Sequence, residues 1–303
     1  MTRRRLLVGL IGRNIQGSLS PPLFVDAFEA SGIDGYYHLM DVDRLPGRTL
    51  SQLLDAVRAL GFAGVNVTYP FKQEVIPLLD VLDLGAEQVG AVNTVAIAPD
   101  GRATGYNFDR SGWRNSFAET FGADAARGKT VVQIGAGGAG RAVAFALMDL
   151  GAGVLVLHDL DRARSGALFG DIAKHYGAAR CRLAGDLERE IAAADGVVNA
   201  TQTGMSGFPG NPVPISALKA THWAADVIYT PVETEFLKAA AAKGARTLNG
   251  GGMCVHQAVE AFRCLTGAGV DVARLHRAFA KGLATRDVAV RTGGGSTTQR
   301  TEQ

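Results

Sequence analysis

The sequence G-A-G-G-A-G at residues 135–140 carries the pattern G-x-G-x-x-G near the middle of the chain. An apolar run at 131–134 precedes these glycines, and helix-forming residues follow at 141–148. A second apolar run at 154–157 ends beside Asp159, about 20 residues after the glycines, as a dinucleotide-binding unit requires. Backbone N–H groups at such a turn bind a pyrophosphate at the positive end of the helix dipole. We therefore favour a dinucleotide site over an ordinary glycine turn.

Asp159 bears on which dinucleotide would bind. A carboxylate at the end of the second strand accepts hydrogen bonds from the ribose hydroxyls and repels a 2′-phosphate, which favours NAD over NADP. The alternative is that Asp159 is a solvated charge at a strand end, and that Arg162 or Arg164 holds a 2′-phosphate.

A second group of polar residues follows the predicted buried strand at 62–68. Asn66, Thr68 and Lys72 lie near its carboxyl end, the edge at which open α/β sheets bind ligands. A lysine there can transfer a proton to or from a substrate hydroxyl. It can equally be a solvated surface charge, and this segment alone leaves both interpretations open.

Four further polar residues have two readings each. Asp109 precedes a predicted helix at 110–117, at the junction of two predicted domains, so it either caps that helix or faces an interdomain cleft. Ser18 and Ser20 stand before the first predicted helix and have the same ambiguity. Gln257 follows a glycine turn at the start of a late helix, where its amide binds a hydroxyl or faces solvent.

Strand and helix signals alternate along the chain and predict an α/β fold with two mainly parallel, doubly wound sheets. A D-G turn at 100–101 predicts a hairpin between 91–97 and 102–106. We expect a substrate and catalytic domain at 1–109 and a Rossmann-type dinucleotide-binding domain at 110–249. Helices at 250–291 should return to pack on the first domain, and a glycine-rich tail at 292–303 should be disordered.

The composition is that of an ordinary soluble globular protein: 47% of the 303 residues are hydrophobic, 20% are charged, and the net charge is +2. This balance favours neither nucleic acid nor a membrane surface as a partner. The three cysteines are far apart and form no C-x-x-C pair, so we expect no disulfide framework and no metal site. No signal peptide is evident, and we expect a cytoplasmic protein acting on a small molecule as a monomer or homodimer.

Taken together, these segments resemble the shikimate/quinate dehydrogenase family over nearly the whole chain, from Gly9 to about Leu283. The matching segments, in family order, are S-L-S-P at 18–21, N-V-T-Y-P-F-K at 66–72, G-A-V-N-T at 90–94, N-F-D at 107–109, the glycine run at 135–140, N-A-T-Q-T-G-M at 199–205, D-V-I-Y-T-P-V-E-T at 226–234, and G-M at 252–253 with Gln257. The segment ending in Lys72 is the most specific of them.

The resemblance implies reversible oxidation of the C3 hydroxyl of shikimate or quinate with NAD. Lys72 and Asp109 would form the catalytic pair. The implied substrate contacts are Ser18 and Ser20 to the carboxylate, Thr68, Asn93, Asp109 and Gln257 to the ring hydroxyls, and Tyr229 closing the site. The implied cofactor contacts are Gly135, Ala136, Gly137, Gly138, Ala139, Asp159, Arg164, Thr201, Gly252 and Met253.

Three positions depart from the usual family pattern. His158-Asp159-Leu160 replaces the Asn-Arg-Thr of NADP-using members, so the chain resembles the NAD-preferring branch. Phe108 replaces a threonine and leaves open a related carbocycle such as aminoshikimate as substrate. Cys254 stands where leucine is common and is interpreted as a small buried hydrophobe. A catalytically silent NAD-binding sensor is a further alternative, which the presence of both Lys72 and Asp109 argues against.

Overall fold

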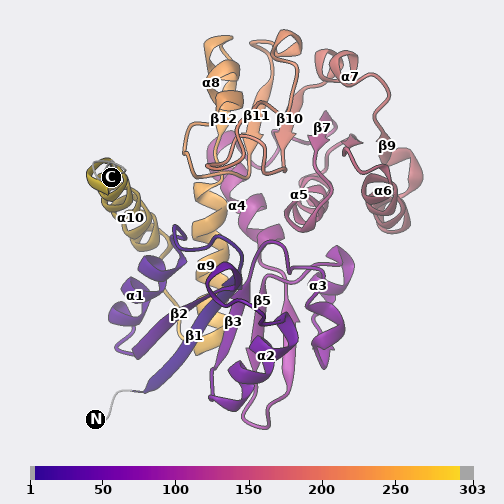
Figure 1. Cartoon of the computed structure of the whole chain (residues 1–303). Helices are drawn as coiled ribbons and strands as arrows, with labels where there is room; N and C mark the ends of the chain where they lie inside the picture. The colour runs from indigo at the N-terminus through magenta and orange to yellow at the C-terminus, as the bar shows by residue number, and fades with distance from the viewer. Residues whose placement is uncertain (1–3, 294–303) are drawn as a thin grey trace, which may run out of the picture.

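Two six-stranded sheets, one in each half of the chain, form the framework of this computed structural model, which describes residues 4–293 (Figure 1). Most of the tail expected at 292–303 lies outside the described residues. Among the described residues, none of the helices has the length and hydropathy that crossing a membrane needs.

The first sheet has the strand order β2-β1-β3-β5-β6-β4. Its strands are β1 (Arg5–Gly12), β2 (Asp34–Asp41), β3 (Gly64–Val67), β4 (Val81–Leu82), β5 (Thr94–Ile97) and β6 (Ala103–Tyr106). Strands β1, β2 and β3 are parallel, whereas β5 runs antiparallel to both β3 and β6. The antiparallel β5–β6 pair confirms the predicted hairpin. The helices of this half are α1 (Ser20–Ala30), α2 (Leu50–Ala59) and α3 (Leu84–Val89).

The second sheet has the order β12-β11-β10-β7-β8-β9, and all its strand pairs are parallel. Its strands are β7 (Thr130–Ile134), β8 (Val154–His158), β9 (Cys181–Leu183), β10 (Gly196–Asn199), β11 (Trp223–Asp226) and β12 (Arg246–Leu248). Its helices are α5 (Gly138–Asp149), α6 (Arg162–Tyr176), α7 (Leu187–Ala193) and α8 (Glu235–Ala242). The strand order reverses between β7 and β10, and ligands of doubly wound sheets bind at such a reversal.

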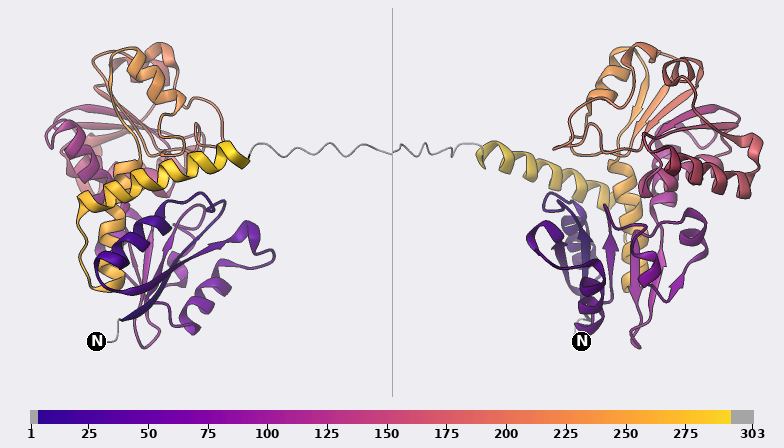
Figure 2. Two further views of the ribbon diagram at one scale, coloured as in Figure 1. Left: turned by 90° about the vertical axis from the view of Figure 1, so that its left-hand side faces the viewer. Right: turned by 45° about the vertical axis from the view of Figure 1, so that its right-hand side comes forward.

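Three helices connect the two halves: α4 (Asp109–Phe121), α9 (Gly251–Thr266) and α10 (Val272–Gly293). Helices α9 and α10 return to α1, where Phe24, Phe262 and Leu275 belong to one buried cluster, as the sequence predicted. In Figure 2 the yellow α10 runs along the boundary between the two halves. The backbones of α4 and α9 approach closely, because a Cβ on Gly112 would lie 3.0 Å from the Met253 carbonyl oxygen.

Some predicted boundaries were wrong. Helix α4 begins at Asp109 itself and continues to Phe121, past the expected end at 117, and α10 continues to Gly293, past the expected end at 291. The edge strands β4, β9 and β12 were not predicted, because two or three residues are too few for a periodic pattern. Four short 3₁₀ helices complete the described elements: η1 (Val42–Arg44), η2 (Ile76–Leu78), η3 (Ala178–Arg180) and η4 (Ile215–Ala217).

Candidate active site

A lysine and an aspartate from different elements form a close pair between the two sheets. Lys72 follows β3, and its Nζ lies 2.5 Å from Oδ2 of Asp109, the first residue of α4. The side chains are only 16% and 7% exposed, so a solvated surface lysine is the wrong interpretation of Lys72. Asp109 does not cap α4 either, because Phe108 occupies the N-cap and it is Asn107 Oδ1 that accepts from the Arg110 N–H at 3.2 Å. The pair is therefore held for another purpose than helix capping.

Two amides extend this pair into a network. Asn93 Nδ2 donates to Asp109 Oδ1 at 3.0 Å and to Gln257 Oε1 at 3.4 Å. Gln257 comes from α9 and donates from Nε2 to the Cys254 carbonyl oxygen at 3.0 Å. Residues from four places in the sequence thus meet around Asp109, and their side chains present one amine, one carboxylate and two amides to a common space.

A second set of contacts fixes the orientation of Asn93. Its Oδ1 accepts from the Phe108 backbone N–H and from the Thr94 hydroxyl, both at 3.0 Å. Asn66 Nδ2 in turn donates to Thr94 Oγ1 at 3.0 Å, and the Tyr37 hydroxyl donates to Asn66 Oδ1 at 2.9 Å. The sequence placed Asn66 at the strand end and Thr94 in a family segment, but it indicated no role for Thr94 or for Tyr37. These buried bonds leave the Asn93 amide with one preferred orientation.

The two serines predicted to bind a carboxylate lie at the start of α1. Ser18 Oγ accepts from the Ser20 N–H, the first N–H of α1, at 3.2 Å, so the Ser18 hydroxyl does satisfy one N–H at the helix start, while Leu19 occupies the N-cap. Burial raises the pKa of Tyr229, while its hydrogen bonds to the Leu19 backbone and the Ser18 side chain act in the opposite direction. Thr68 lies beside Gly12, where a Cβ would come within 2.4 Å of Thr68 Cγ2.

Cys254 lies among these residues. Burial raises the pKa of its thiol to about 12, and Tyr229 and Gln257 hydrogen-bond to it. A thiol that holds its proton so firmly is a poor nucleophile. The interpretation of Cys254 as a buried small hydrophobe agrees with this geometry.

The glycine loop adjoins the Lys72–Asp109 pair. A Cβ on Gly138 would lie 3.0 Å from Cβ of Lys72, so the start of α5 reaches the lysine. Gly135 has a φ of 104°, and a Cβ on Gly140 would lie 2.2 Å from the Gly135 carbonyl oxygen, so both positions require glycine. A Cβ on Gly137 would meet no described atom within 4 Å. The open space at the N-terminus of α5 therefore fits the pyrophosphate of a dinucleotide.

Asp159 is fixed at the edge of this loop. Its Oδ2 accepts from the Ala136 N–H at 2.7 Å, and its Oδ1 accepts from the Asp161 N–H at 2.8 Å. Arg164 lies nearby but pairs with Asp161 at 3.2 Å. Thr201, after β10, borders the loop, because a Cβ on Gly135 would lie 2.9 Å from its Cγ2.

Gly252 and Met253 lie in the packing between α9 and α4. A Cβ on Gly252 would lie 2.1 Å from Ser116 Oγ, and Met253 is 7% exposed. Their contacts with a cofactor, like that of Arg164, stay predictions.

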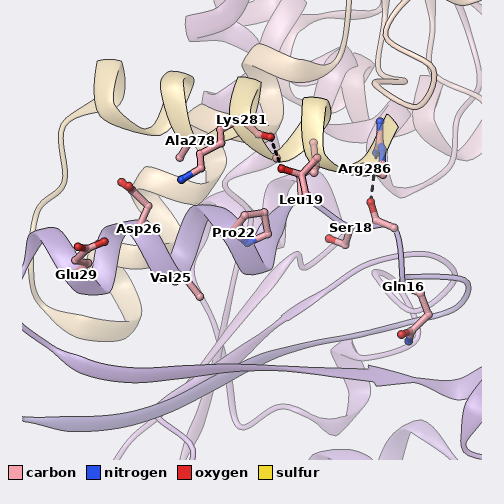
Figure 3. A pocket seen from close by; sticks show the side chains of 13 residues that line it. Gln16, Ser18, Leu19, Pro22, Val25, Asp26, Glu29, Ala278, Lys281 and Arg286 are labelled. Carbon is pink, nitrogen blue, oxygen red and sulfur yellow. Dashed lines mark hydrogen bonds between the residues drawn. The ribbon is translucent and has the colours of Figure 1, made fainter. Parts of the chain in front are cut away.

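A groove of about 430 Å³ lies outside this network, between α1 and α10 (Figure 3). Ser18 and Arg286 lie at one end of it, and Asp26 and Glu29 lie toward the other. Arg286 donates from Nη1 to Thr230 Oγ1 at 2.7 Å and to the Gly17 carbonyl oxygen at 3.3 Å. Neither Lys72 nor Asp109 lines this groove, so it is a separate feature next to the serine end of the network.

Comparison with known proteins places this arrangement in a family. Residues 10–95 match the model of the shikimate dehydrogenase substrate binding domain. A quinate/shikimate dehydrogenase (NAD(+)) of Corynebacterium efficiens is 46% identical over 283 residues, covering 92% of this chain and 99% of the relative. The chain belongs to the shikimate dehydrogenase family.

Members that use either cofactor resemble the chain to a similar degree. A shikimate dehydrogenase (NADP(+)) of Streptomyces avermitilis is 47% identical over 279 residues, covering 91% of this chain and 95% of the relative. The structure of quinate dehydrogenase from Corynebacterium glutamicum in complex with NAD is 43% identical and superposes with a TM-score of 0.85, covering 92% of this chain and all of that one. Family membership therefore fixes the fold and the class of reaction, while the cofactor has to be argued from the residues.

Proposed function

We propose that the chain is an NAD-dependent dehydrogenase that reversibly oxidises the C3 hydroxyl of quinate, shikimate or both. The observation that carries this proposal is the Lys72–Asp109 pair, joined to Asn93 and placed against Gly138 of the glycine loop. A proton-transfer group beside a dinucleotide site is what oxidation of a secondary alcohol requires.

The chain's own residues handle the hydroxyl proton. Lys72 Nζ accepts it as the general base, and the Asp109 carboxylate accepts a hydrogen bond from the same hydroxyl and then pairs with the resulting ammonium. The nicotinamide ring, when bound, accepts the hydride from the ring carbon. Because the pair is largely buried, water has little access to it, and its electrostatic interactions are stronger than at the surface.

The remaining polar groups would orient the substrate ring. Ser18 and Ser20 bind its carboxylate, next to Tyr229, which closes that side. Thr68, Asn93 and Gln257 hold ring hydroxyls. Asn93 and Gln257 already hydrogen-bond to one another at 3.4 Å, a long contact that ring hydroxyls can replace.

NAD is the cofactor that the glycine loop supports. Its pyrophosphate would be held by the glycine loop, which comprises Gly135, Ala136, Gly137, Gly138 and Ala139. Asp159 would accept hydrogen bonds from the ribose hydroxyls. The Asp159 carboxylate is already fixed on Ala136, so it would repel a 2′-phosphate at that place. Arg164 is engaged by Asp161, which weakens the alternative of an arginine-bound phosphate.

The same proposal extends to the organisation of the chain. Residues 1–109 would form the substrate domain, 110–249 the NAD-binding domain and 250–291 the helices that close the first. The three cysteines are free, as is usual in the reducing cytoplasm, where we place the protein as a monomer or homodimer.

A matrix of initial rates tests this proposal. Purified protein is assayed for NADH or NADPH formation with quinate, shikimate and an aminoshikimate, each against NAD and NADP. We expect turnover of quinate or shikimate, with NAD giving the higher kcat/KM. Turnover of the aminoshikimate alone would show that the proposed substrate is wrong. Phe108, which stands where the family usually has threonine, would then be the first residue to test for the changed specificity. No turnover in any combination would leave the silent sensor as the better account.

A further inference from the structure

Three metal-ligating side chains meet away from the active site, on the helices that join the two halves. They are Glu119 of α4, His256 of α9 and His276 of α10, and one ligand atom of each lies within 4.8 Å of the other two. Glu119 lies ten residues after Asp109 on the same helix, or about 15 Å along its axis. The cluster is therefore distinct from the Lys72–Asp109 pair.

The spacing of the ligand atoms suits a small transition-metal ion. Glu119 Oε2 lies 3.0 Å from His256 Nε2 and 3.8 Å from His276 Nε2. Two ligands bound to a tetrahedral Zn²⁺, each about 2.0–2.1 Å from the ion, are about 3.3 Å apart. The two separations from Glu119 Oε2 lie on either side of this value, and the ligand atoms of the two histidines lie within 4.8 Å of one another, so side-chain rotations can bring the three atoms around one ion.

His256 supplies an independent indication of a ligand. Its side chain is only 8% exposed, and among the described residues its buried Nε2 makes no hydrogen bond, although Glu119 Oε2 lies 3.0 Å away. Buried polar nitrogens in folded proteins normally have a partner. A metal ion between His256 and Glu119 would satisfy both atoms at once.

We propose that Glu119, His256 and His276 form a binding site for a divalent transition-metal ion, Zn²⁺ above all. Two imidazoles and one carboxylate are a donor set that suits Zn²⁺, whereas Mg²⁺ and Ca²⁺ prefer oxygen ligands alone. The side chains of Glu119 and His276 are 53% and 41% exposed, so a water molecule can complete the coordination from the solvent side.

The ion would link three helices that hold the active site together. Asp109 begins α4, and Gln257 directly follows His256 on α9. Binding at this place ties α4 and α9 to α10, so its main effect is on the stability of the folded chain. The proposed reaction needs no metal, so metal binding at this site can be tested without measuring the reaction.

The test uses the untagged full chain, stripped with a chelator and titrated with ZnCl₂ by calorimetry. We expect one Zn²⁺ per chain and a Tm that rises with added ZnCl₂. His276→Ala and Glu119→Gln change exposed side chains, so both variants should fold. Loss of a residue that only supports a metal ligand weakens binding by about 10–100-fold. Each of these variants removes a ligand itself, so its affinity for Zn²⁺ should fall by more than that.

His38→Ala, which removes an exposed histidine on β2, is the matched control and should bind Zn²⁺ as the wild type does. The alternative is an ordinary ion pair between Glu119 and protonated histidines. In that case the variants would shift Tm equally with and without ZnCl₂. Either that result, or Zn²⁺ affinity that is unchanged in both variants, would overturn the proposal.

Discussion

The two halves of the proposed active site are built by different means. On the substrate side, the working groups are side chains held by other side chains, as Asn93 is held by Thr94 and Asp109. On the proposed cofactor side, the groups that would bind are backbone N–H groups at the start of α5, in a turn where Gly135 and Gly140 leave no room for a Cβ and Gly137 borders open space.

Because of this difference, a substitution should have a different effect in each half. Changing a side chain on the substrate side should remove chemistry while the sheets persist. On the cofactor side, adding a single methyl group should be enough to weaken cofactor binding, because the backbone itself would make the contacts. The predictions that follow test this contrast, beginning with the largest expected effect.

Lys72→Gln should lower kcat for alcohol oxidation by about 10²–10⁴-fold, the usual worth of a general base. Glutamine keeps a hydrogen-bond donor near Asp109 but cannot take up a proton. Steady-state NADH formation measures the effect, and Lys238→Gln, an exposed lysine on α8, is the matched control. A variant that keeps most of its turnover would remove Lys72 from the mechanism.

Gly137→Ala and Gly140→Ala should fail in different ways. The Cβ at position 137 meets no described atom, so the fold should persist while KM for NAD rises, by about 10–100-fold. The Cβ at position 140 collides with the Gly135 carbonyl oxygen, so that variant should also lose about 1–3 kcal/mol of stability. Urea unfolding and NAD titration separate the two effects. An unchanged KM in Gly137→Ala would mean that the cofactor does not lie against this loop.

Asp159→Asn should reduce the preference for NAD over NADP by about 10-fold, since a hydrogen bond to a charged group is lost and the repulsion of a 2′-phosphate disappears. Asparagine has one acceptor oxygen, so it can keep the bond from the Ala136 N–H, which holds the glycine loop, and loses the bond from the Asp161 N–H. The ratio of kcat/KM for the two cofactors measures the change, with Asp124→Asn as a surface control. A ratio that does not move would assign cofactor choice to other residues.

Asp226, at the end of β11, makes the stability of the fold depend on pH. Burial raises its pKa from 3.8 to about 6, although hydrogen bonds from Ile228, Thr234 and Asn199 oppose this shift. The folded state then holds this proton more tightly than the unfolded state does. The contribution of Asp226 to stability is therefore complete below about pH 4 and falls as the pH rises to about 6, by about 3 kcal/mol in all.

Asp226→Asn should remove this part of the pH dependence, because the amide does not titrate. Urea unfolding of both proteins between pH 4 and pH 7 isolates it as the difference between the two curves. Parallel curves would show that Asp226 has the same pKa in the folded and unfolded states.

The sequence predicted the parts of this molecule that depend on local patterns. Apolar runs identified β3, β7 and β8, and the D-G turn identified the β5–β6 hairpin. The glycine loop was predictable for the same reason, since its residues are consecutive in the sequence.

Features made by chain segments that meet only in the fold were not predictable. Tyr37 on β2 hydrogen-bonds to Asn66 on β3, and β1 lies between these two strands. The spacing of the two residues in the sequence does not predict this bond. Likewise, the sequence predicted no metal site, because Glu119, His256 and His276 come together only when α9 and α10 return to α4. Lys72 and Asp109 were paired in advance only through the family resemblance.

A crystal structure of the chain with NAD and quinate or shikimate tests the central claim most directly. The account predicts that Lys72 Nζ and a carboxylate oxygen of Asp109 both lie within about 3 Å of the same ring hydroxyl. The nicotinamide should lie next to the carbon that bears this hydroxyl. A substrate bound in the groove between α1 and α10, with no ring hydroxyl in reach of Lys72, would contradict it.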